Sequence, residues 1–381
     1  MTRRQLLALA TAAAAGAASK RYRVGVIGHT GRGNYGHGLD VVWKAFPSAE
    51  IVSVADPVAE GLAKAQERTG AKRTYSDYRE MLSTEKLDFV SVCPRHMDQK
   101  VELVTAVAEA GAHMYLEKAF AYNLQDADRM VAAIRAAGVK VQIAHQMRRS
   151  PHLLKILDMI GEGEIGQIQE VRARGKEDSR AGGEDLMVLG SHVLDMMRVL
   201  LGDPRWVFSH VTDDGREMDP IRLGKAREPV GPVAGNEMAA MYSFDGGVHG
   251  YFATKAAEVT HPDRFGAHIY GEKGVIFLPF GIYPKGDPRI LRAPRWVPDS
   301  KHAWEPIVPE RPALQAPDSM LANALMVADL IDAVERDRKP ACSEADGLWT
   351  TEMIVGTYQS QVAGRPLEFP LRDRTHPLSG G

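Results

Sequence analysis

Cysteine is scarce in this sequence, and no spacing of cysteine or histidine indicates a metal site. The only two cysteines, Cys93 and Cys342, lie far apart in the 381 residues, so they form neither a Cys-x-x-Cys pair nor a disulfide framework. The thirteen histidines are scattered and include no His-Glu-x-x-His run. We therefore expect no metal site.

An excess of charge of one sign is also missing. The formal net charge is −2, so no overall basic field indicates a nucleic-acid partner. The apolar run near the start of the chain, Leu6–Ala15, falls short of the ~20 residues that a membrane-spanning helix needs. We expect no stable membrane anchor and no nucleic-acid binding, and the length is sufficient for two domains.

The first twenty residues are typical of an export signal. Two arginines, Arg3 and Arg4, precede an apolar segment that ends at Ala15 and gives way to small residues. This is the order of regions in a secretory signal, and the arginine pair resembles the twin-arginine pattern. The alternative is an alanine-rich tail that begins with two arginines. We predict an export signal over residues 1–20, a periplasmic location, and a fold that starts near Arg21.

A strand, a glycine-rich turn, a helix and a second strand are expected from Arg23 onward. The apolar strand Arg23–Ile27 leads directly into the turn Gly28–Gly33. Apolar side chains at helical spacing then predict a helix: Leu39, Val42, Trp43 and Phe46. The next strand, Ile51–Asp56, ends in an acid. This is the order of a Rossmann unit, which we place over residues 21–148; the alternative for the turn is a surface loop.

The turn and the acid carry the prediction of a cofactor. Gly28 permits a tight turn, Gly33 permits close packing, and the N-terminus of the following helix would receive a pyrophosphate. Thr30 stands where G-x-G-x-x-G has its second glycine, so Gly31 would allow the close approach. Asp56 would accept hydrogen bonds from the adenosine ribose and repel a 2′-phosphate, which favours NAD over NADP. The candidate cofactor-binding residues of the turn are Gly28, Thr30, Gly31, Arg32 and Gly33.

Strands and helices keep alternating after Asp56, which is typical of a parallel, doubly wound sheet. Further strands are expected over 87–93, 113–116 and 139–144. Ligands of such sheets bind beyond the carboxyl ends of the strands. The residues that follow two of these ends are therefore candidates for the cofactor site or the adjoining crevice: Pro94, Arg95, His96, Glu117 and Lys118.

The pattern changes after residue 148. Apolar residues now alternate with polar ones, and Asp245-Gly246 stands between two such runs as a hairpin signal. We predict an α+β domain with an open, mostly antiparallel sheet over residues 149–381, in an α/β protein whose N-terminal part is the Rossmann doubly wound parallel sheet. Residues 213–235 and 280–317 are expected to be loops that serve as a lid or an oligomer arm.

The chain resembles the Gfo/Idh/MocA family of sugar-handling NAD(P) enzymes. Gly111–Lys118 is similar to the family's G-K-H-V-x-x-E-K-P strand, with Ala119 in place of the proline. Gly190–Asp195 is similar to its D-x-G-x-H-x-x-D helix, with Val188 in place of the first acid. The C-terminal stretch from Ile331 resembles its closing helices. The likeness runs from about Arg23 to Pro370, and it implies a Rossmann domain and an open-sheet substrate domain. We also expect a homo-oligomer.

The resemblance implies three catalytic residues. Lys118 would donate to the reacting oxygen, and His192 would take the hydroxyl proton, as a histidine with an unperturbed pKa of ~6.5 can near neutral pH. Asp195, three residues after His192, would share its helix face and orient the imidazole or bind a sugar hydroxyl. Glu184 and Asp185 are candidates to supply the carboxylate that Val188 lacks. Without the resemblance, such a lysine is usually a surface residue and such a histidine is usually structural.

Three functions remain open on the sequence alone. The first is an NAD(P)-dependent oxidoreductase acting on a hydroxyl of a sugar or glycoside. The second is an NAD-dependent glycosidase that oxidises a hydroxyl transiently, eliminates the aglycone and returns the hydride. The third is a non-catalytic ligand-binding relative, against which the presence of both Lys118 and His192 speaks. Because the twin-arginine route carries folded proteins, an exported chain would hold its NAD tightly and recycle it within the site.

Overall fold

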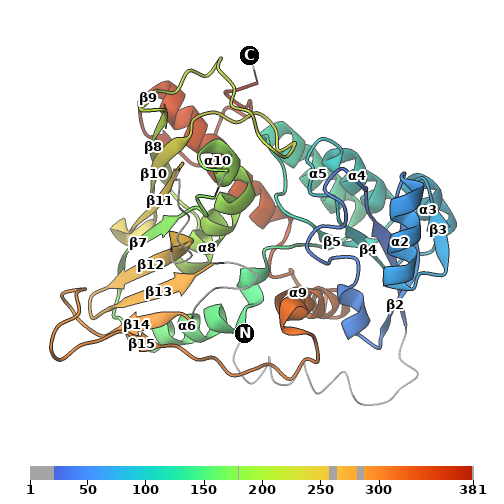
Figure 1. The fold of residues 1–381 in the computed structure, drawn as a ribbon, viewed down its shortest axis with the longest axis horizontal. Coiled ribbons are helices and arrows are strands. Elements are labelled where there is room, and N and C mark those ends of the chain that lie inside the picture. Colours follow the sequence, from blue (N-terminus) through green and yellow to red (C-terminus); the bar gives the residue numbers. More distant parts are fainter. Residues whose placement is uncertain (1–20, 179, 257–263, 281–286, 380–381) are drawn as a thin grey trace. The chain divides into compact units, whose positions relative to one another are not determined.

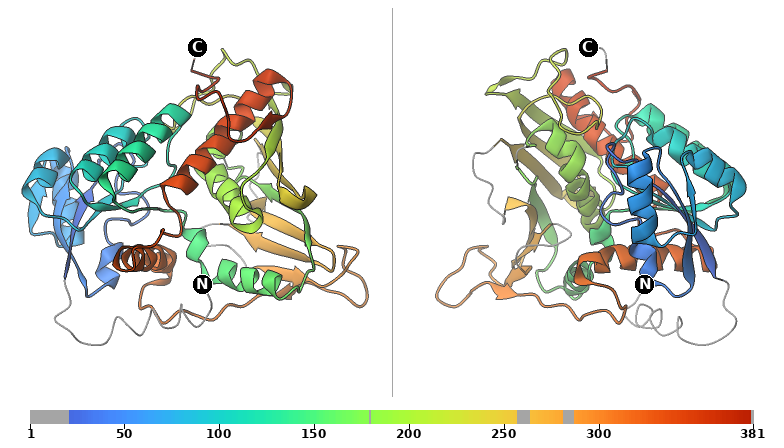
Figure 2. Two further views of the ribbon diagram at one scale, coloured as in Figure 1. Left: turned by 180° about the vertical axis from the view of Figure 1, so that it is seen from behind. Right: turned by 45° about the vertical axis from the view of Figure 1, so that its right-hand side comes forward.

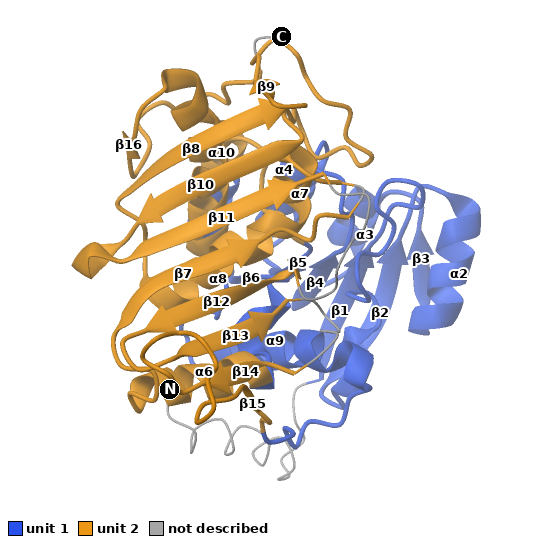
Figure 3. Cartoon of the chain, turned by 60° about the vertical axis from the view of Figure 1, so that its left-hand side comes forward, with its two compact units in different colours: residues 1–117, 130–151, 310–344 blue, residues 118–129, 152–309, 345–381 orange. Residues whose placement is uncertain are grey.

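The computed structural model describes residues 21–178, 180–256, 264–280 and 287–379, which form two compact units. Figure 3 colours the units separately. The first unit contains the chain up to Glu117 together with Met130–Pro151 and Glu310–Glu344; the second contains Lys118–Arg129, His152–Pro309 and the chain from Ala345. The predicted export signal lies outside the described residues. No helix in the described ranges has the length and apolar character needed to cross a bilayer.

The first unit is built on a six-stranded sheet in the order β3-β2-β1-β4-β5-β6 (Figure 1). Every neighbouring pair is parallel, and the order is that of a doubly wound Rossmann sheet. The predicted fold class is confirmed for this unit. The strands are β1 (Tyr22–Ile27), β2 (Ala49–Ala55), β3 (Arg73–Tyr75), β4 (Phe89–Val92), β5 (His113–Leu116) and β6 (Val141–Ile143).

Helices connect these strands, and local sequence sets where they begin and end. The side chain of Asp77 caps α3 by accepting from the Arg79 amide at 2.8 Å, and Gly70 ends α2 with a φ of 76°. The helices with residues in this unit are α2 (Ala59–Thr69), α3 (Tyr78–Thr84), α4 (Lys100–Glu109), α5 (Leu124–Ala137), α9 (Asp318–Glu335) and the 3₁₀ turns η1 (Val42–Ala45) and η2 (Gln146–Arg149).

The helix predicted directly after the glycine-rich turn is wrong. The backbone runs through successive turns as far as residue 41, and only η1 is helical before β2. The reason is a series of left-handed residues that an α-helix cannot include: Gly31, Gly33, Asn34, Gly36 and Gly38 have φ values between 53° and 84°. The apolar residues that suggested the helix are nevertheless used, because Leu39, Val42 and Trp43 are all buried.

The second unit is built on a ten-stranded sheet in the order β15-β14-β13-β12-β7-β11-β10-β8-β16, with β9 paired to β8. All pairs are antiparallel except β7 with β11, so the predicted mostly antiparallel sheet is confirmed. The strands are β7 (Ile168–Arg174), β8 (Trp206–Asp213), β9 (Arg216–Glu217), β10 (Glu237–Ser243), β11 (His249–Lys255), β12 (Gly266–Gly271), β13 (Val275–Pro279), β14 (Arg289–Leu291), β15 (Glu305–Pro306) and β16 (Leu367–Glu368).

Helices cover one face of this sheet, as Figures 1 and 2 show for α8 (Ser191–Leu201) and α10 (Glu344–Ala363). The Tyr242 hydroxyl lies 2.7 Å from Thr357 Oγ1 of α10, and Ser209 Oγ donates to the Thr357 carbonyl. The predicted hairpin at Asp245-Gly246 is confirmed between β10 and β11. The two predicted loops contain short strands, β9 in the first and β14 and β15 in the second. The remaining helices are α6 (Pro151–Gly161), α7 (Gly183–Asp185) and the π-helix η3 (Leu186–Gly190).

His376 predicts an acid-sensitive stability of the second unit. Its ring is buried beside Tyr358, and burial lowers its pKa from 6.5 to about 4. Below pH 6.5 His376 is therefore protonated in the unfolded chain, whereas in the folded chain its ring stays neutral until about pH 4. Stability from this group is complete above pH 6.5 and falls as the pH drops from 6.5 to 4, by ~2 kcal/mol at pH 5.

Urea unfolding at pH 7.5 and pH 5 measures this loss. His376→Asn keeps an acceptor for the Leu378 amide, which donates to His376 Nδ1 at 3.2 Å, and removes the titration. We expect the difference between the two pH values to shrink by ~2 kcal/mol in this variant. The exposed His210→Asn serves as control and leaves the difference as in the wild type. An undiminished difference in His376→Asn would contradict the assignment.

Candidate active site

The glycine-rich turn after β1 is closed by its own hydrogen bonds. The Gly28 amide donates to the Ala55 carbonyl at 2.9 Å, and the His29 and Arg32 amides donate to the Asn34 and His29 carbonyls at 3.2 and 3.0 Å. The Asn34 side chain accepts from the Gly31 amide at 2.9 Å. Several amides of the turn are therefore already hydrogen-bonded, either within the turn or to residues at the end of β2. Sequence analysis missed Asn34, although asparagine is a frequent turn residue whose side chain bonds to nearby backbone.

The turn packs against the segment that follows β4. A Cβ on Gly33 would lie 2.3 Å from the Arg95 amide nitrogen, so only glycine permits this approach. Around Gly31, by contrast, a Cβ would meet nothing within 4 Å, and its φ of 82° is what requires glycine there. Arg32 forms an ion pair with Asp98, and Pro94 is buried. The structure thus brings the predicted turn next to Pro94, at the carboxyl end of the sheet.

Asp56 is fully buried (0% exposed) at the end of β2 and is surrounded by donors from its own unit. Its carboxylate accepts from Thr30 Oγ1 at 2.7 Å, from the Tyr35 hydroxyl at 2.8 Å and from the Val58 amide at 2.9 Å. Burial and this carboxylate raise the pKa of Tyr35, so the phenol stays protonated as the donor. A Cβ on Gly28 would lie 2.2 Å from the Tyr35 ring. Gly28 therefore makes room for Tyr35, a partner of Asp56 that sequence analysis missed.

Glu117 forms a second buried carboxylate at the same edge of the sheet. Its Oε2 accepts from the His37 amide at 3.2 Å, and its Oε1 lies 3.3 Å from His37 Nδ1. The buried Lys100 donates its ammonium to the Glu117 carbonyl at 2.8 Å. A Cβ on Gly36 would lie 2.4 Å from Glu117 Oε2. The chain after the predicted turn is thereby tied to the end of β5, where Glu117 was predicted to line the cofactor site.

Lys118 belongs to the second unit, and its side chain is buried (6% exposed). Its ammonium donates to the Val188 main-chain carbonyl at 3.0 Å. The Lys118–Ala119 peptide bond is cis. Val188 lies in the π-helix η3, which joins α7 to α8. The structure therefore brings Lys118 to the helical segment that carries the other predicted catalytic residues.

His192 and Asp195 both lie in the first turn and a half of α8, as predicted. The His192 side chain is half-buried, and Asp195 is buried. Their three-residue separation on this helix places them on neighbouring positions of one face. The helix is confirmed, and the catalytic roles of His192, Asp195 and Lys118 stay predictions.

The two acids considered as substitutes for the one missing at Val188 have structural partners. Asp185 accepts from Thr254 Oγ1 at 2.6 Å and from the Glu177 amide at 3.1 Å, and burial raises its pKa. Glu184 accepts from the amides of Arg227 and Glu228 at 3.0 and 3.2 Å. These contacts tie Asp185 to β11 and to the segment after β7, and Glu184 to the loop that contains Arg227.

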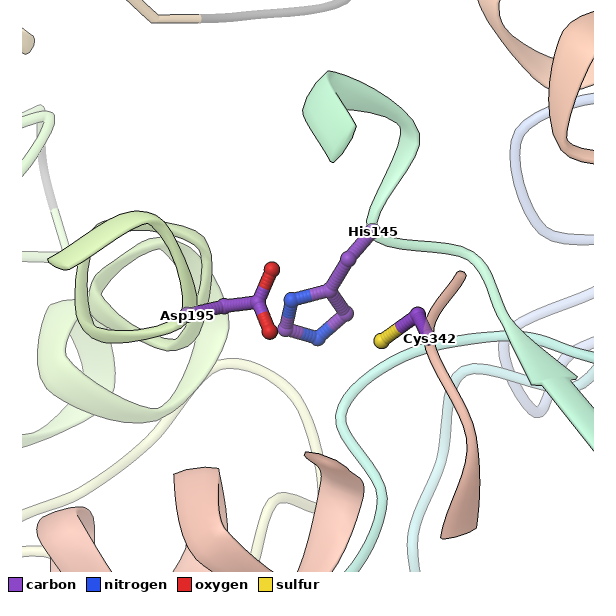
Figure 4. A group of neighbouring side chains, drawn as sticks. All are labelled: His145, Asp195 and Cys342. Carbon is purple, nitrogen blue, oxygen red and sulfur yellow. The ribbon is translucent and has the colours of Figure 1, made fainter. Parts of the chain in front are cut away.

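Figure 4 draws three buried side chains with metal-ligating atoms, His145, Asp195 and Cys342. His145 and Cys342 are in the first unit, where the Ile143 amide donates to the Cys342 carbonyl at 2.8 Å and holds the two segments together. Their ligand atoms lie within 4.8 Å of each other. Asp195 is on α8 of the other unit. Two ligands of one unit are fewer than the three or four that a protein zinc site uses. The expectation that the protein has no metal site stays a prediction.

The chain has a Rossmann sheet in its first unit and a mostly antiparallel sheet in its second. The family model described as "Oxidoreductase family, NAD-binding Rossmann fold" matches residues 22–145, and the one described as "Oxidoreductase family, C-terminal alpha/beta domain" matches residues 158–369. The chain therefore belongs to the Gfo/Idh/MocA family, and the predicted resemblance is confirmed. The division between residues 148 and 149 stays a prediction.

Several characterised proteins are similar to this chain. A D-apiose dehydrogenase of Paraburkholderia graminis is 35% identical over 42% of this chain and 45% of its own length. A myo-inositol 2-dehydrogenase of Thermotoga maritima is 26% identical over 67% and 74%. The match to the first of these spans about half of that relative.

Solved structures share the fold. Levoglucosan dehydrogenase in complex with NADH and levoglucosan has a TM-score of 0.72 and 21% identity, covering 92% of this chain and 99% of that one. An NAD-binding oxidoreductase from Klebsiella pneumoniae has a TM-score of 0.74 and 20% identity, covering 93% and 100%. At this identity the likeness establishes the two-part fold.

Tyr35→Phe predicts how much the buried hydroxyl on Asp56 contributes to stability. The variant removes one donor from a buried carboxylate and should lower the free energy of unfolding by ~1–3 kcal/mol. Tyr78→Phe is a matched control, because the Tyr78 hydroxyl is buried without a hydrogen-bond partner among the described residues. Urea denaturation should show a loss in the first variant and almost none in the second. Equal effects would mean that the Tyr35–Asp56 bond adds nothing beyond packing.

Proposed function

We propose that this protein is an NAD-dependent oxidoreductase that acts on a hydroxyl of a sugar. The observation that carries the proposal is the position of Lys118. This residue comes directly after Glu117, just past the end of β5, and its buried ammonium donates to the Val188 carbonyl in the helical segment before His192. Family relatives named for their substrates act on apiose, inositol and levoglucosan, all polyhydroxylated compounds. A sugar hydroxyl is the substrate class that these names share.

The three predicted catalytic residues divide the proton and charge chemistry. Lys118 donates a hydrogen bond to the oxygen on which negative charge develops as the hydroxyl is oxidised, and a buried donor acts strongly there because water is excluded. His192 accepts the hydroxyl proton. Asp195 orients the imidazole or holds a neighbouring hydroxyl of the sugar. NAD, when bound, supplies the hydride acceptor.

Asp56 of the first unit is of the type that binds the ribose diol of NAD, whereas no α-helix begins directly after the turn to receive the pyrophosphate. The turn Gly28–Gly33 follows β1, and Asp56 directly follows β2, where a Rossmann unit holds the pyrophosphate and the ribose diol. In this structure the hydroxyls of Thr30 and Tyr35 both donate to Oδ2 of the Asp56 carboxylate, an oxygen that a ribose diol would use. Binding of NAD at Asp56 therefore requires that these two hydroxyls release the carboxylate, and the ribose would replace them with donors of the same kind.

Lys118→Ala is expected to abolish most turnover while NAD stays bound. Loss of one charged donor at a reacting oxygen costs on the order of 10²–10³ in kcat, whereas the turn and Asp56 are untouched. The exposed Lys64→Ala is the control and should keep wild-type kinetics. Steady-state kinetics with a panel of sugars and calorimetric titration with NAD measure both effects. Near-normal turnover of Lys118→Ala would rule out its catalytic role.

Product analysis in the same assay identifies the reaction. Net oxidation yields a keto sugar and one reduced cofactor for each turnover. A cleaved glycoside without accumulated reduced cofactor would instead assign the transient-oxidation glycosidase.

We also propose that the chain is exported through the twin-arginine route with NAD already bound. The support is the arginine pair and the short apolar segment within residues 1–20, together with the Rossmann fold, because free NAD is scarce outside the cytosol. Cell fractionation, followed by mass spectrometry of the small molecules released on denaturation, tests both parts. The expected result is periplasmic protein that carries about one dinucleotide per chain. Retention in the cytosol of chain without dinucleotide would contradict the proposal.

A homo-oligomer is the assembly that we propose. The second unit's sheet carries a row of large side chains in register on the face opposite to that contacting α10: Phe208, Met241, Tyr251, Arg172 and His268. Phe208 is exposed, and the Arg172 guanidinium lies 5.8 Å from the Tyr251 ring centre. Such a patch favours a protein partner, and light scattering of the mature chain tests whether the partner is a second copy.

A further inference from the structure

The aromatic ring of Tyr35 lies between the first glycine of the turn and the acid that follows β2. A Cβ on Gly28 would be 2.2 Å from this ring, so the ring packs directly on the Gly28 backbone. At its far end the phenol donates to Asp56 Oδ2 at 2.8 Å. A Rossmann unit binds the adenosine ribose at such an acid and the pyrophosphate at such a turn. The Tyr35 side chain therefore fills space that the adenosine half of a dinucleotide would use.

We propose that the Tyr35 side chain competes with the adenosine ribose for Asp56 and thereby determines how tightly the chain binds NAD. The inference rests on the proposed function, because it takes NAD as the ligand of the first unit. It adds to that function a residue that controls affinity for the cofactor and has no part in the chemistry.

Asp56 can exchange one set of donors for another without moving. Its Oδ1 accepts from the Val58 amide at 2.9 Å, and the Thr30 amide lies 3.2 Å from Oδ1 and 3.0 Å from Oδ2. The two side-chain hydroxyls, from Thr30 and Tyr35, both donate to Oδ2. Main-chain donors thus hold the carboxylate, and hydroxyl donors complete its hydrogen bonds. A ribose diol also carries two hydroxyls, so it can replace the side-chain donors while the main-chain donors stay.

The backbone on both sides of Tyr35 is held in place, so its side chain is the part that can leave. Before it, Gly33 packs so closely on the segment after β4 that a Cβ would lie 2.3 Å from an amide nitrogen. After it, the His37 amide donates to Glu117 at 3.2 Å, and the His37 carbonyl accepts from Asn323 Nδ2 at 3.0 Å. A change of rotamer at Tyr35 would move the phenol away from Asp56 and leave these contacts intact.

The bond from Tyr35 to Asp56 weakens NAD binding because it has to be broken first. A ligand that must displace an existing contact binds less tightly by the free energy of that contact. A hydrogen bond to a charged acceptor is worth about a tenfold change in a binding constant. Arg68 adds to the cost, since its guanidinium lies 4.7 Å from the Tyr35 ring centre and its Nε pairs with the buried Asp40 at 2.6 Å.

Tyr35→Phe tests the proposal, because phenylalanine keeps the ring and lacks the hydroxyl that binds Asp56. We expect NAD to bind about tenfold more tightly to this variant than to the wild type, measured by isothermal titration calorimetry. Without ligand the variant is less stable to urea, so stability and affinity change in opposite directions. Equal or weaker binding of NAD by Tyr35→Phe would overturn the proposal.

Tyr75→Phe is the matched control in the same unit. The Tyr75 hydroxyl donates to Glu85 Oε1 at 2.9 Å, and both side chains are buried, so this variant also removes a phenol from a buried carboxylate. It should lose stability and bind NAD like the wild type. Nicotinamide mononucleotide lacks the adenosine half and should bind equally to all three proteins. A gain of affinity in Tyr75→Phe, or a gain for the mononucleotide, would show general loosening and refute competition at Asp56.

A spectroscopic readout follows the Tyr35 ring itself. With 3-fluorotyrosine in place of tyrosine, the 19F resonance of each ring has a shift difference between H2O and D2O that increases with exposure to water. Tyr35→Phe and Tyr75→Phe assign the two resonances by their loss. We expect AMP, which carries the ribose diol without nicotinamide, to increase this difference at Tyr35 and to leave it unchanged at Tyr75. An unchanged Tyr35 resonance with AMP bound would contradict displacement of the ring.

The possible results separate this inference from the proposed function. Tighter NAD binding by Tyr35→Phe, with no sugar oxidised by the wild type, supports the competition and refutes the sugar oxidoreductase. Sugar oxidation by the wild type, with equal NAD affinity in both proteins, refutes the competition alone. If neither the wild type nor Tyr35→Phe binds NAD, both proposals fail.

Discussion

A carboxylate that is removed from water must be fully hydrogen-bonded, and this constraint organises the carboxyl edge of the Rossmann sheet. Asp56 has no exposed surface, so the chain supplies Thr30, Tyr35 and Val58 as its donors. Two of these donors lie in the segment that follows β1. The hydrogen bonds to this one buried acid therefore hold that segment in place. The left-handed residues among positions 31–38 allow its backbone to make the necessary turns.

The same constraint operates in the second unit. Asp185 and Glu177 are both buried, and Glu177 accepts from the Lys255 amide at 2.9 Å and from Arg264 at 2.6 Å. Glu177 has a φ of 54°, a conformation that non-glycine residues rarely adopt. The loop that leads into α7 and η3 is thus held by buried carboxylates rather than by a long helix or a strand. The π-turn that meets Lys118 is built on this support.

Both units therefore contain buried, hydrogen-bonded carboxylates, but these have different roles in the two units. In the Rossmann unit, the buried acid is the group proposed to bind a ligand, and its present donors are hydroxyls that a ribose diol resembles. In the second unit, the buried acids Asp185 and Glu177 accept hydrogen bonds that hold the backbone of the loop before η3.

Much of this protein was determined by patterns that are local in sequence. Alternating strands and helices define a parallel sheet, period-two alternation with Asp245-Gly246 defines an antiparallel hairpin, and the motifs at Glu117-Lys118 and Gly190–Asp195 identify the family. Local patterns indicate how a segment can pack, but they do not indicate which distant group will form hydrogen bonds with its polar atoms. The helix expected after Gly33 failed for this reason, since helical spacing of Leu39, Val42 and Trp43 was compatible with burial in a non-helical segment.

Only the tertiary structure decided that Tyr35 and Thr30 bind Asp56, that His37 binds Glu117, and that the Val188 backbone binds Lys118. These partners are separated by 21 to 80 residues along the chain, and one of them is a carbonyl that every residue possesses. Side-chain identity therefore carries no signal for the last contact. The reason is physical: a buried polar group must find a partner in three dimensions, and the partner is whichever donor or acceptor the fold places beside it.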